Sequence, residues 1–329
     1  MDDLATGELE RRLRDFALNG RMMERLAQLK GEAEPLPEPP ELASVDAEGL
    51  LQRVMARFEA AGRPLSRRDA LNLCACLAVS PVLILGGPVG CGKGETARLL
   101  AEALGWTGAG RFAAFPAGED SLGDDARLAE LARLPESPAM LLLPDANRFP
   151  GCDPFRGLDA ALRPAWRLCA TVQDSHSGFP WTAPALDRGF MVRLNSGADA
   201  PWQPLPDTAT LPEPPVSLDA LAEWMPHAEA DVPVACAERM EALRRALARC
   251  GAPVSRRALD ETWRYCGVMT AGLGEEADPM EIIDLAVAQR LLPALLASAP
   301  APALSKLPAL LEDLPVSLAR LDEPLPVLI

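Results

Sequence analysis

The sequence predicts an α/β protein in which a parallel sheet flanked by helices carries a phosphate-binding loop and precedes an all-helical C-terminal region. Short apolar runs alternate with helical patterns between residues 81 and 194, which is typical of a parallel sheet. A glycine-rich loop follows the first of these runs and opens a helix. Beyond residue 216 only helical patterns occur, so this part is expected to be a separate all-α domain.

The composition is that of a globular chain with enough apolar material for a packed core. The chain has 329 residues, or about two domains, and 49% of them are hydrophobic. Its net charge of −15 does not indicate a nucleic-acid-binding surface. Eight cysteines without a CxxC pair, with only two histidines, argue against a zinc site. The charged start is not a signal peptide and no apolar run approaches the ~20 residues of a membrane span, so we expect a cytoplasmic protein with reduced cysteines.

The N-terminal part, residues 1–44, is predicted to be a helix on a linker. Apolar residues recur at helical spacing over 3–30, whereas the acidic, proline-rich stretch 31–44 can form neither a helix nor a central strand. An amphipathic helix held in this way is a candidate docking element for a protein partner. Packing of the helix back onto the rest of the chain is an equal alternative.

The α/β core is predicted to span residues 45–198. It begins with helices over 46–62 and 66–79, and Ser66 is the expected N-cap of the second helix. Strands are then expected at 81–85, 111–115, 139–143, 166–172 and 190–194, with helices at 95–104 and 124–134.

A second proline-rich linker, residues 199–216, separates this core from a predicted helical domain over 217–329. The helices of that domain are expected at 217–225, 234–250, 255–271, 278–297 and 303–313.

The loop after the first strand has the G-x-x-x-x-G-K spacing of a P-loop. Its glycines let backbone N–H groups curl around phosphate oxygens, and the amino end of the following helix adds a favourable dipole. A lysine at the end of the loop reaches the β- and γ-phosphates. The residues predicted to hold a nucleotide here are Gly87, Pro88, Val89, Gly90, Cys91, Gly92, Lys93, Gly94 and Glu95.

One position of this loop departs from the pattern. The residue after the lysine is normally Ser or Thr, whose hydroxyl is a ligand of Mg²⁺, and here it is Gly94. Thr96 lies two residues further along the helix and does not replace that hydroxyl without a shift of the loop. Phosphate binding is therefore expected to survive, with Mg²⁺ binding weakened.

The segment LGGPVGCGKGETARLLAEALG resembles the Walker A region of AAA+ ATPases, and its surroundings resemble the dynein-related, McrB-like branch. Three further segments are similar to that branch: RPLSRRDALNLCACLAVSPVLILGG, TVQDSHSGFPWTAPALDRGFMVRLN and the helical pair VSRRALDETWRYCG with MEIIDLAVAQRLLPALL. The resemblance covers residues 62–315. It implies a nucleotide-binding core with a helical lid, working in a homo- or hetero-oligomeric ring.

The resemblance also implies a Walker B strand that ends in Asp-Glu, and two alignments remain open. Asp145 is either the metal-side Asp, with Ala146 in place of the catalytic Glu, or a short substitute for that Glu, with Pro144 in place of the Asp. The second alignment matches Asn147-Arg148 to an Asn-Arg pair of the family. Either way one carboxylate is missing, and Asp145 is the candidate catalytic and metal-binding residue.

Three more residues acquire roles from the resemblance. Gln173 aligns with the Asn called sensor 1, and Arg188 in LDRGF aligns with the arginine finger that one subunit offers to its neighbour's nucleotide. Arg257 aligns with the lid arginine called sensor 2, although Arg256 beside it leaves the register open.

The departures at Gly94, at the missing Walker B carboxylate and at Gln173 fall on groups that hold metal and water, while the phosphate-binding positions are kept. The sequence therefore predicts a protein that binds ATP, ADP or GTP with little or no hydrolysis and acts as a regulatory or structural ring subunit. The alternatives are an active AAA+ NTPase that remodels protein or nucleic acid in a restriction or defence system, and a structural protein that binds no nucleotide.

Overall fold

The computed structural model describes residues 41–108, 111–115, 138–147, 165–173, 181–194, 214–227 and 231–322. The chain divides into two compact units, Met1–Pro39 and Pro40–Ile329. The first unit lies outside the described residues, as do the helix predicted at 124–134 and most of the linker at 199–216. The fold described below is that of the second unit.

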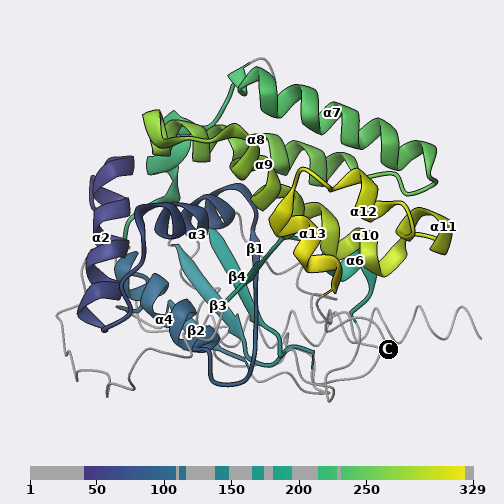
Figure 1. Ribbon diagram of the computed structural model, residues 1–329. Helices are drawn as coiled ribbons and strands as arrows, with labels where there is room; N and C mark the ends of the chain where they lie inside the picture. The colour runs from purple at the N-terminus through teal and green to yellow at the C-terminus, as the bar shows by residue number, and fades with distance from the viewer. Residues whose placement is uncertain are drawn as a thin grey trace, which may run out of the picture. The chain divides into compact units, whose positions relative to one another are not determined.

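A five-stranded sheet forms the centre of this unit, and every pairing in it is parallel (Figure 1). Its spatial order is β2-β3-β4-β1-β5. The strands are β1 (Val82–Gly86), β2 (Phe112–Ala114), β3 (Ala139–Leu143), β4 (Trp166–Thr171) and β5 (Phe190–Arg193). All five lie where the apolar runs predicted them, which confirms the α/β class.

The strands are apolar on both faces because both faces are covered. One face shares a core with α2 (Ala47–Ala60), α3 (Arg67–Val79) and α4 (Lys93–Ala103). On the other face Ile84 and Leu143 pack with Leu186 of the short helix α6 (Ala183–Leu186). The predicted cap is confirmed, since Ser66 Oγ accepts a hydrogen bond from the N–H of Asp69 at the start of α3.

The register places the ends of three strands side by side. Ala170 of β4 is the partner of Ile84 of β1 and of Leu143 of β3. The loop after β1, the turn after β3 and the end of β4 therefore meet at one edge of the sheet, here called the carboxyl edge. The opposite edge, where these strands begin, is called the amino edge.

The C-terminal part is helical, as predicted. Its elements are the 3-10 helix η3 (Leu218–Trp224), α7 (Val234–Arg249), α8 (Arg256–Leu273), η5 (Gly274–Glu276), α9 (Pro279–Ala286), the π-helical turn η6 (Val287–Leu291), α10 (Leu292–Ser298), α11 (Ala301–Leu304), α12 (Leu307–Leu310) and α13 (Pro315–Asp322). The pattern over 278–297 corresponds to α9, η6 and α10, which follow one another directly.

The helix predicted over 303–313 is wrong as a single element. The chain forms two short helices, α11 and α12, and Pro308 lies in the first turn of α12. Because proline lacks an N–H and its ring clashes with the carbonyl four residues earlier, a continuous helix through this position is unfavourable.

Helix α13 was not predicted, and its start depends on a distant side chain. Asp284 of α9 is buried, and its two carboxylate oxygens accept hydrogen bonds from the N–H groups of Val316 and Ser317, each at 2.7 Å. These bonds satisfy donors that the first turn of a helix leaves without partners. A cap supplied from more than 30 residues away leaves no local signal in the sequence.

A buried polar contact joins α3 of the core to α8 of the helical region. The hydroxyl of Tyr265 donates to Asn72 Oδ1 at 2.6 Å, and the Tyr265 ring packs against Phe190 of β5 with a centroid distance of 5.1 Å. Both partners of this hydrogen bond are buried. The contact therefore couples the helical region to the sheet and to α3 at the same time.

Tyr265→Phe should lower the free energy of unfolding by about 1–2 kcal/mol, because it leaves a buried acceptor with one hydrogen bond fewer. Urea denaturation followed by circular dichroism would measure the loss. Tyr265→Leu removes the ring contact as well and should cost more. Equal stability of Tyr265→Phe and the parent chain would contradict the importance of this bond.

Candidate functional site

The loop between β1 and α4 has the backbone conformation that its glycines were expected to allow. Gly87, Gly90 and Gly92 have φ values of +144°, +83° and +82°. A Cβ at Gly87 would lie 2.4 Å from the carbonyl oxygen of Leu194, so a side chain there requires the backbone to move. The strand, loop and helix thus have the arrangement in which backbone N–H groups and a helix amino end bind an anion.

Lys93 lies inside the loop, where only 7% of it is exposed. Its Nζ donates to the carbonyl oxygens of Gly87 and Pro88, each at 2.8 Å, and lies 3.8 Å from Cys91 Sγ. The ammonium group is therefore fixed against the loop, while Val89 at the loop's tip is 70% exposed. This combination of one fixed cation and a glycine-rich loop fits a phosphate group.

Arg63 is a contact of the loop that the sequence reasoning missed. It lies between α2 and α3, and its guanidinium donates to the carbonyl oxygens of Cys91 at 2.9 Å and Gly92 at 3.2 Å. It is separated from the loop by 28 and 29 residues, and no spacing in the sequence connects the two.

The start of α4 offers no hydroxyl toward the loop. A Cβ at Gly94 would meet nothing within 4 Å, so there is space for a side chain but no side chain to fill it. Thr96 is buried, and the carboxylate of Glu95 binds Arg98 within the same helix, with one bond of 3.1 Å from Arg98 Nε. Neither residue replaces the missing hydroxyl.

The turn after β3 brings Asp145 and Gln173 together at the carboxyl edge. Gln173 Nε2 donates to Asp145 Oδ1 at 2.6 Å, and the N–H of Asp145 donates to Thr171 Oγ1 at 2.9 Å. Asn147 fixes the end of β4 by donating to the carbonyl of Gln173 at 2.9 Å and accepting from its N–H at 3.1 Å. Asp145 itself has a φ of +49°, an unusual value for a non-glycine residue. Because β4 lies between β3 and β1, the Gln173 end of β4 separates Asp145 from the phosphate-binding loop.

Ala146 is only 4% exposed and belongs to an apolar cluster with Ile84, Leu143 and Leu186. A Glu at this position would carry its carboxylate into that cluster rather than toward Gln173. Asp145 is thus the residue of this turn whose carboxylate contacts Gln173. Arg148, which one of the two Walker B alignments uses, lies outside the described residues.

Ala146→Glu should lower the free energy of unfolding by about 3 kcal/mol, because it buries a carboxylate in apolar surroundings. Thermal or urea denaturation would measure this change. The matched control is Ala60→Glu at the exposed end of α2, which should change stability by less than about 0.5 kcal/mol. A stable Ala146→Glu variant would show that the turn can present this side chain to solvent.

Asp145 is the residue of the turn after β3 that could contribute a carboxylate to a Mg²⁺ ion. No group of three or more His, Cys, Asp or Glu side chains within the described residues could hold a metal ion. Asp145 stands without a hydroxyl at Gly94 to share the ligation, and one of its oxygens already accepts from Gln173.

Arg188 and Arg257, the two arginines predicted to contact nucleotide, lie at the amino edge of the sheet and not beside the phosphate-binding loop of the same chain. Arg188 directly precedes Gly189 and β5, and its carbonyl accepts a hydrogen bond from Ser80 Oγ at 3.2 Å, just before β1. The five residues of β1, at about 3.3 Å each, put roughly 17 Å of strand between this position and the loop. An arginine side chain is too short to span that distance, so Arg188 does not reach the phosphate-binding loop of its own chain.

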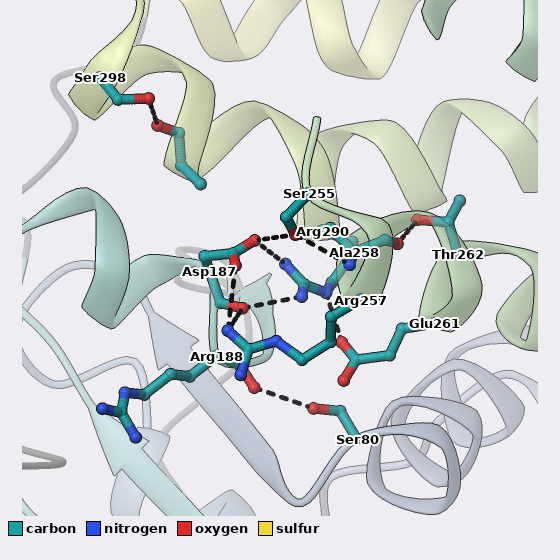
Figure 2. Close-up of polar contacts among 11 residues, drawn as sticks. Ser80, Asp187, Arg188, Ser255, Arg257, Ala258, Glu261, Thr262, Arg290 and Ser298 are labelled. Carbon is teal, nitrogen blue, oxygen red and sulfur yellow. Dashed lines mark hydrogen bonds and ion pairs between the residues drawn. The ribbon is translucent and has the colours of Figure 1, made fainter. Parts of the chain in front are cut away.

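Arg257, at the start of α8, lies in the same region, because its Nη2 donates to the carbonyl of Asp187 at 2.5 Å and to Asp187 Oδ2 at 3.0 Å. Figure 2 shows its guanidinium against Asp187, whereas the side chain of Arg188 is turned away from this cluster. A cavity of about 500 Å³ lies here, lined by both arginines and by residues of α6, α8 and α10. The structure therefore brings Arg257 to Arg188 and not to its own chain's phosphate-binding loop.

A buried ion pair, formed by Arg290 and Glu261, is connected to this cluster through Asp187. Arg290 is fully buried, and its Nε donates to Glu261 at 2.5 Å while Nη2 donates to the carbonyl of Asp187 at 2.8 Å. Burial raises the pKa of Glu261, and the charge of Arg290 opposes that rise. The pair thus fixes the turn that carries Asp187 and Arg188 to the helical region.

Arg290→Met should lower the free energy of unfolding by about 3–5 kcal/mol, because it leaves Glu261 buried without its partner. The double variant Arg290→Met/Glu261→Leu should recover most of that loss, and chemical denaturation of all three chains would measure it. The exposed pair Arg244–Glu241 on α7 gives the control, since Arg244→Met should cost less than about 1 kcal/mol. Additive losses in the double variant would contradict the pairing.

No family model matches the chain, and no curated protein matches it by sequence. Several solved structures, including the following two, are similar to it. PCH-2 from C. elegans is 13% identical, with 88% of this chain and 75% of that chain covered and a TM-score of 0.26. A DNA polymerase III gamma subunit-related protein from Thermotoga maritima is 11% identical, with 79% and 96% covered and a TM-score of 0.28. At TM-scores this low, neither likeness supports a conclusion about this chain.

Proposed function

We propose that this chain is a nucleotide-binding protein of the AAA+ type, which holds ATP, ADP or GTP by its phosphates. The observation that carries the proposal is the Gly87–Lys93 loop, with three glycines at positive φ between a buried strand and a helix. The order β5-β1-β4-β3-β2 places β4 between β1 and β3, so that the phosphate-binding loop, Gln173 and Asp145 follow one another along the carboxyl edge. The particular McrB-like branch remains a matter of sequence resemblance.

Hydrolysis by this chain is proposed to be slow or absent. Gly94 supplies no metal ligand, and Asp145 is the carboxylate that the turn after β3 presents to Gln173. Loss of a metal ligand or an activating carboxylate costs orders of magnitude in rate, at about 1.4 kcal/mol per tenfold. The retained phosphate loop with a weakened metal site supports a regulatory or structural role over that of a motor.

A ring assembly is proposed from the position of the arginines. Arg188 and Arg257 lie at the amino edge, while the phosphate-binding loop lies at the carboxyl edge. Each chain would therefore offer arginines to a nucleotide held by another chain, either an identical copy or a homologue with intact catalytic residues. The N-terminal helix predicted at 3–30 is the candidate contact for a further protein partner.

Calorimetric titration with ADP, ATP and GTP, in Mg²⁺ and in EDTA, tests this proposal. The chain should bind nucleotide in EDTA, and Lys93→Ala should weaken binding at least about tenfold, or ~1.4 kcal/mol, by removing the fixed cation. Lys306→Ala, at an exposed position in the helical region, is the matched control and should bind like the parent chain.

The other outcomes separate the alternatives. Binding that requires Mg²⁺, together with steady turnover, would overturn the regulatory proposal in favour of an active NTPase. Absence of binding by the parent chain to all three nucleotides would overturn nucleotide binding itself and leave a structural protein.

A further inference from the structure

Arg63, which lies outside the phosphate-binding loop in the sequence, is hydrogen-bonded to that loop. The residue follows the end of α2, where its N–H donates to the carbonyl of Phe58 at 2.9 Å. Its guanidinium donates through Nη2 to the carbonyl oxygen of Cys91 and through Nη1 to that of Gly92. The contact is close, because a Cβ added at Gly92 would lie 2.1 Å from Arg63 Nη1. The positive φ of Gly92 favours glycine at this position, and a side chain there would in addition displace the Arg63 guanidinium from the loop.

The two carbonyls that Arg63 binds belong to the peptide groups whose N–H donors are those of Gly92 and Lys93. In a trans peptide the C=O and N–H bonds point in opposite directions, and the described chain contains no cis peptide bond. A guanidinium on the carbonyl side therefore directs these two N–H groups to the other side of the loop. That is the side on which a P-loop binds phosphate.

The charge of Arg63 acts in the same direction as its hydrogen bonds. No carboxylate among the described residues forms an ion pair with it, so its positive charge is not cancelled locally. Arg63 and Lys93 both donate to carbonyl oxygens of the loop, which gives the loop two fixed cations. A positive charge on the carbonyl side of the loop also attracts an anion on the opposite side, because Coulomb attraction falls only as the inverse of the distance.

We propose that Arg63 is a positioning residue of the phosphate-binding loop, and that its charge lets the loop hold a nucleoside di- or triphosphate without Mg²⁺. The inference rests on the proposed function, since it names the group that substitutes for the metal ion in that site. It explains how a loop with Gly94 in place of a hydroxyl can still balance the charge of a polyphosphate.

The experiment is calorimetric titration of the full chain with ADP in EDTA at several salt concentrations. Arg63→Gln keeps an N–H donor for the loop carbonyls but removes the charge, and it should bind ADP roughly tenfold more weakly. Its affinity should also depend less on salt than that of the parent chain, because one fewer charge is screened. Arg63→Lys keeps the charge and should bind within about threefold of the parent, with the parent's salt dependence.

Two controls make the result specific. Arg264→Gln removes an exposed arginine on α8, away from the loop, and should change neither the affinity nor its salt dependence. Thermal melting of each variant without nucleotide shows whether the fold is intact. If Arg63→Gln melts early, Arg63→Lys decides the matter: parent-like salt dependence supports the proposal, and reduced salt dependence overturns it.

Failure of this inference differs from failure of the proposed function. If the parent chain binds ADP through Lys93 while Arg63→Gln binds equally well, the role of Arg63 is wrong and nucleotide binding stands. If the parent chain binds ADP only when Mg²⁺ is present, the claim that Arg63 substitutes for the metal is overturned. If the parent chain binds no nucleotide in either condition, both proposals fall together.

Discussion

Pairing of β1 on both sides, with β4 and with β5, is the constraint on which the rest of this structure depends. Because all five residues of β1 are buried in the middle of the sheet, the loop that follows it has to emerge at the carboxyl edge. The same pairing brings Gln173 and then Asp145 to that edge through β4 and β3. It also packs Gly87 against the backbone at the end of β5, which ties the conformation of the loop to the sheet.

The sheet separates two sets of charged groups that sequence motifs alone would combine into one site. Lys93 and Arg63 act on the loop at the carboxyl edge, and Arg188 and Arg257 lie at the amino edge. In the proposed assembly the arginines of one chain meet the loop of another, and repeated contact between such unlike surfaces generates rings when the rotation closes. The buried pair of Arg290 and Glu261 links the amino edge to the helical region, so the helices and the arginines are mechanically connected.

The proposed mode of binding balances the phosphate charge with side chains rather than with a metal ion. A hydroxyl that would help to hold Mg²⁺ is absent at Gly94, and the neighbouring Glu95 is engaged with Arg98 of its own helix. In the proposed mode of binding, the positive charge of Arg63, on the carbonyl side of the loop, compensates for the missing hydroxyl. Fixed side-chain cations need no metal to be recruited, which suits a subunit that holds nucleotide rather than turning it over.

The order and type of nearly all the described elements followed from the sequence, because apolar runs, helical periodicity and the cap at Ser66 are local signals. The glycine loop also followed from its spacing, and Gln173 was singled out by the resemblance to AAA+ ATPases. Four features did not: the break between α11 and α12, the start of α13 on Asp284, the burial of Ala146 and the contact of Arg63 with the loop. The break between α11 and α12 falls at Pro308, which is a local signal in the sequence. The other three depend on residues far apart in the chain, and only tertiary packing decides which of these meet.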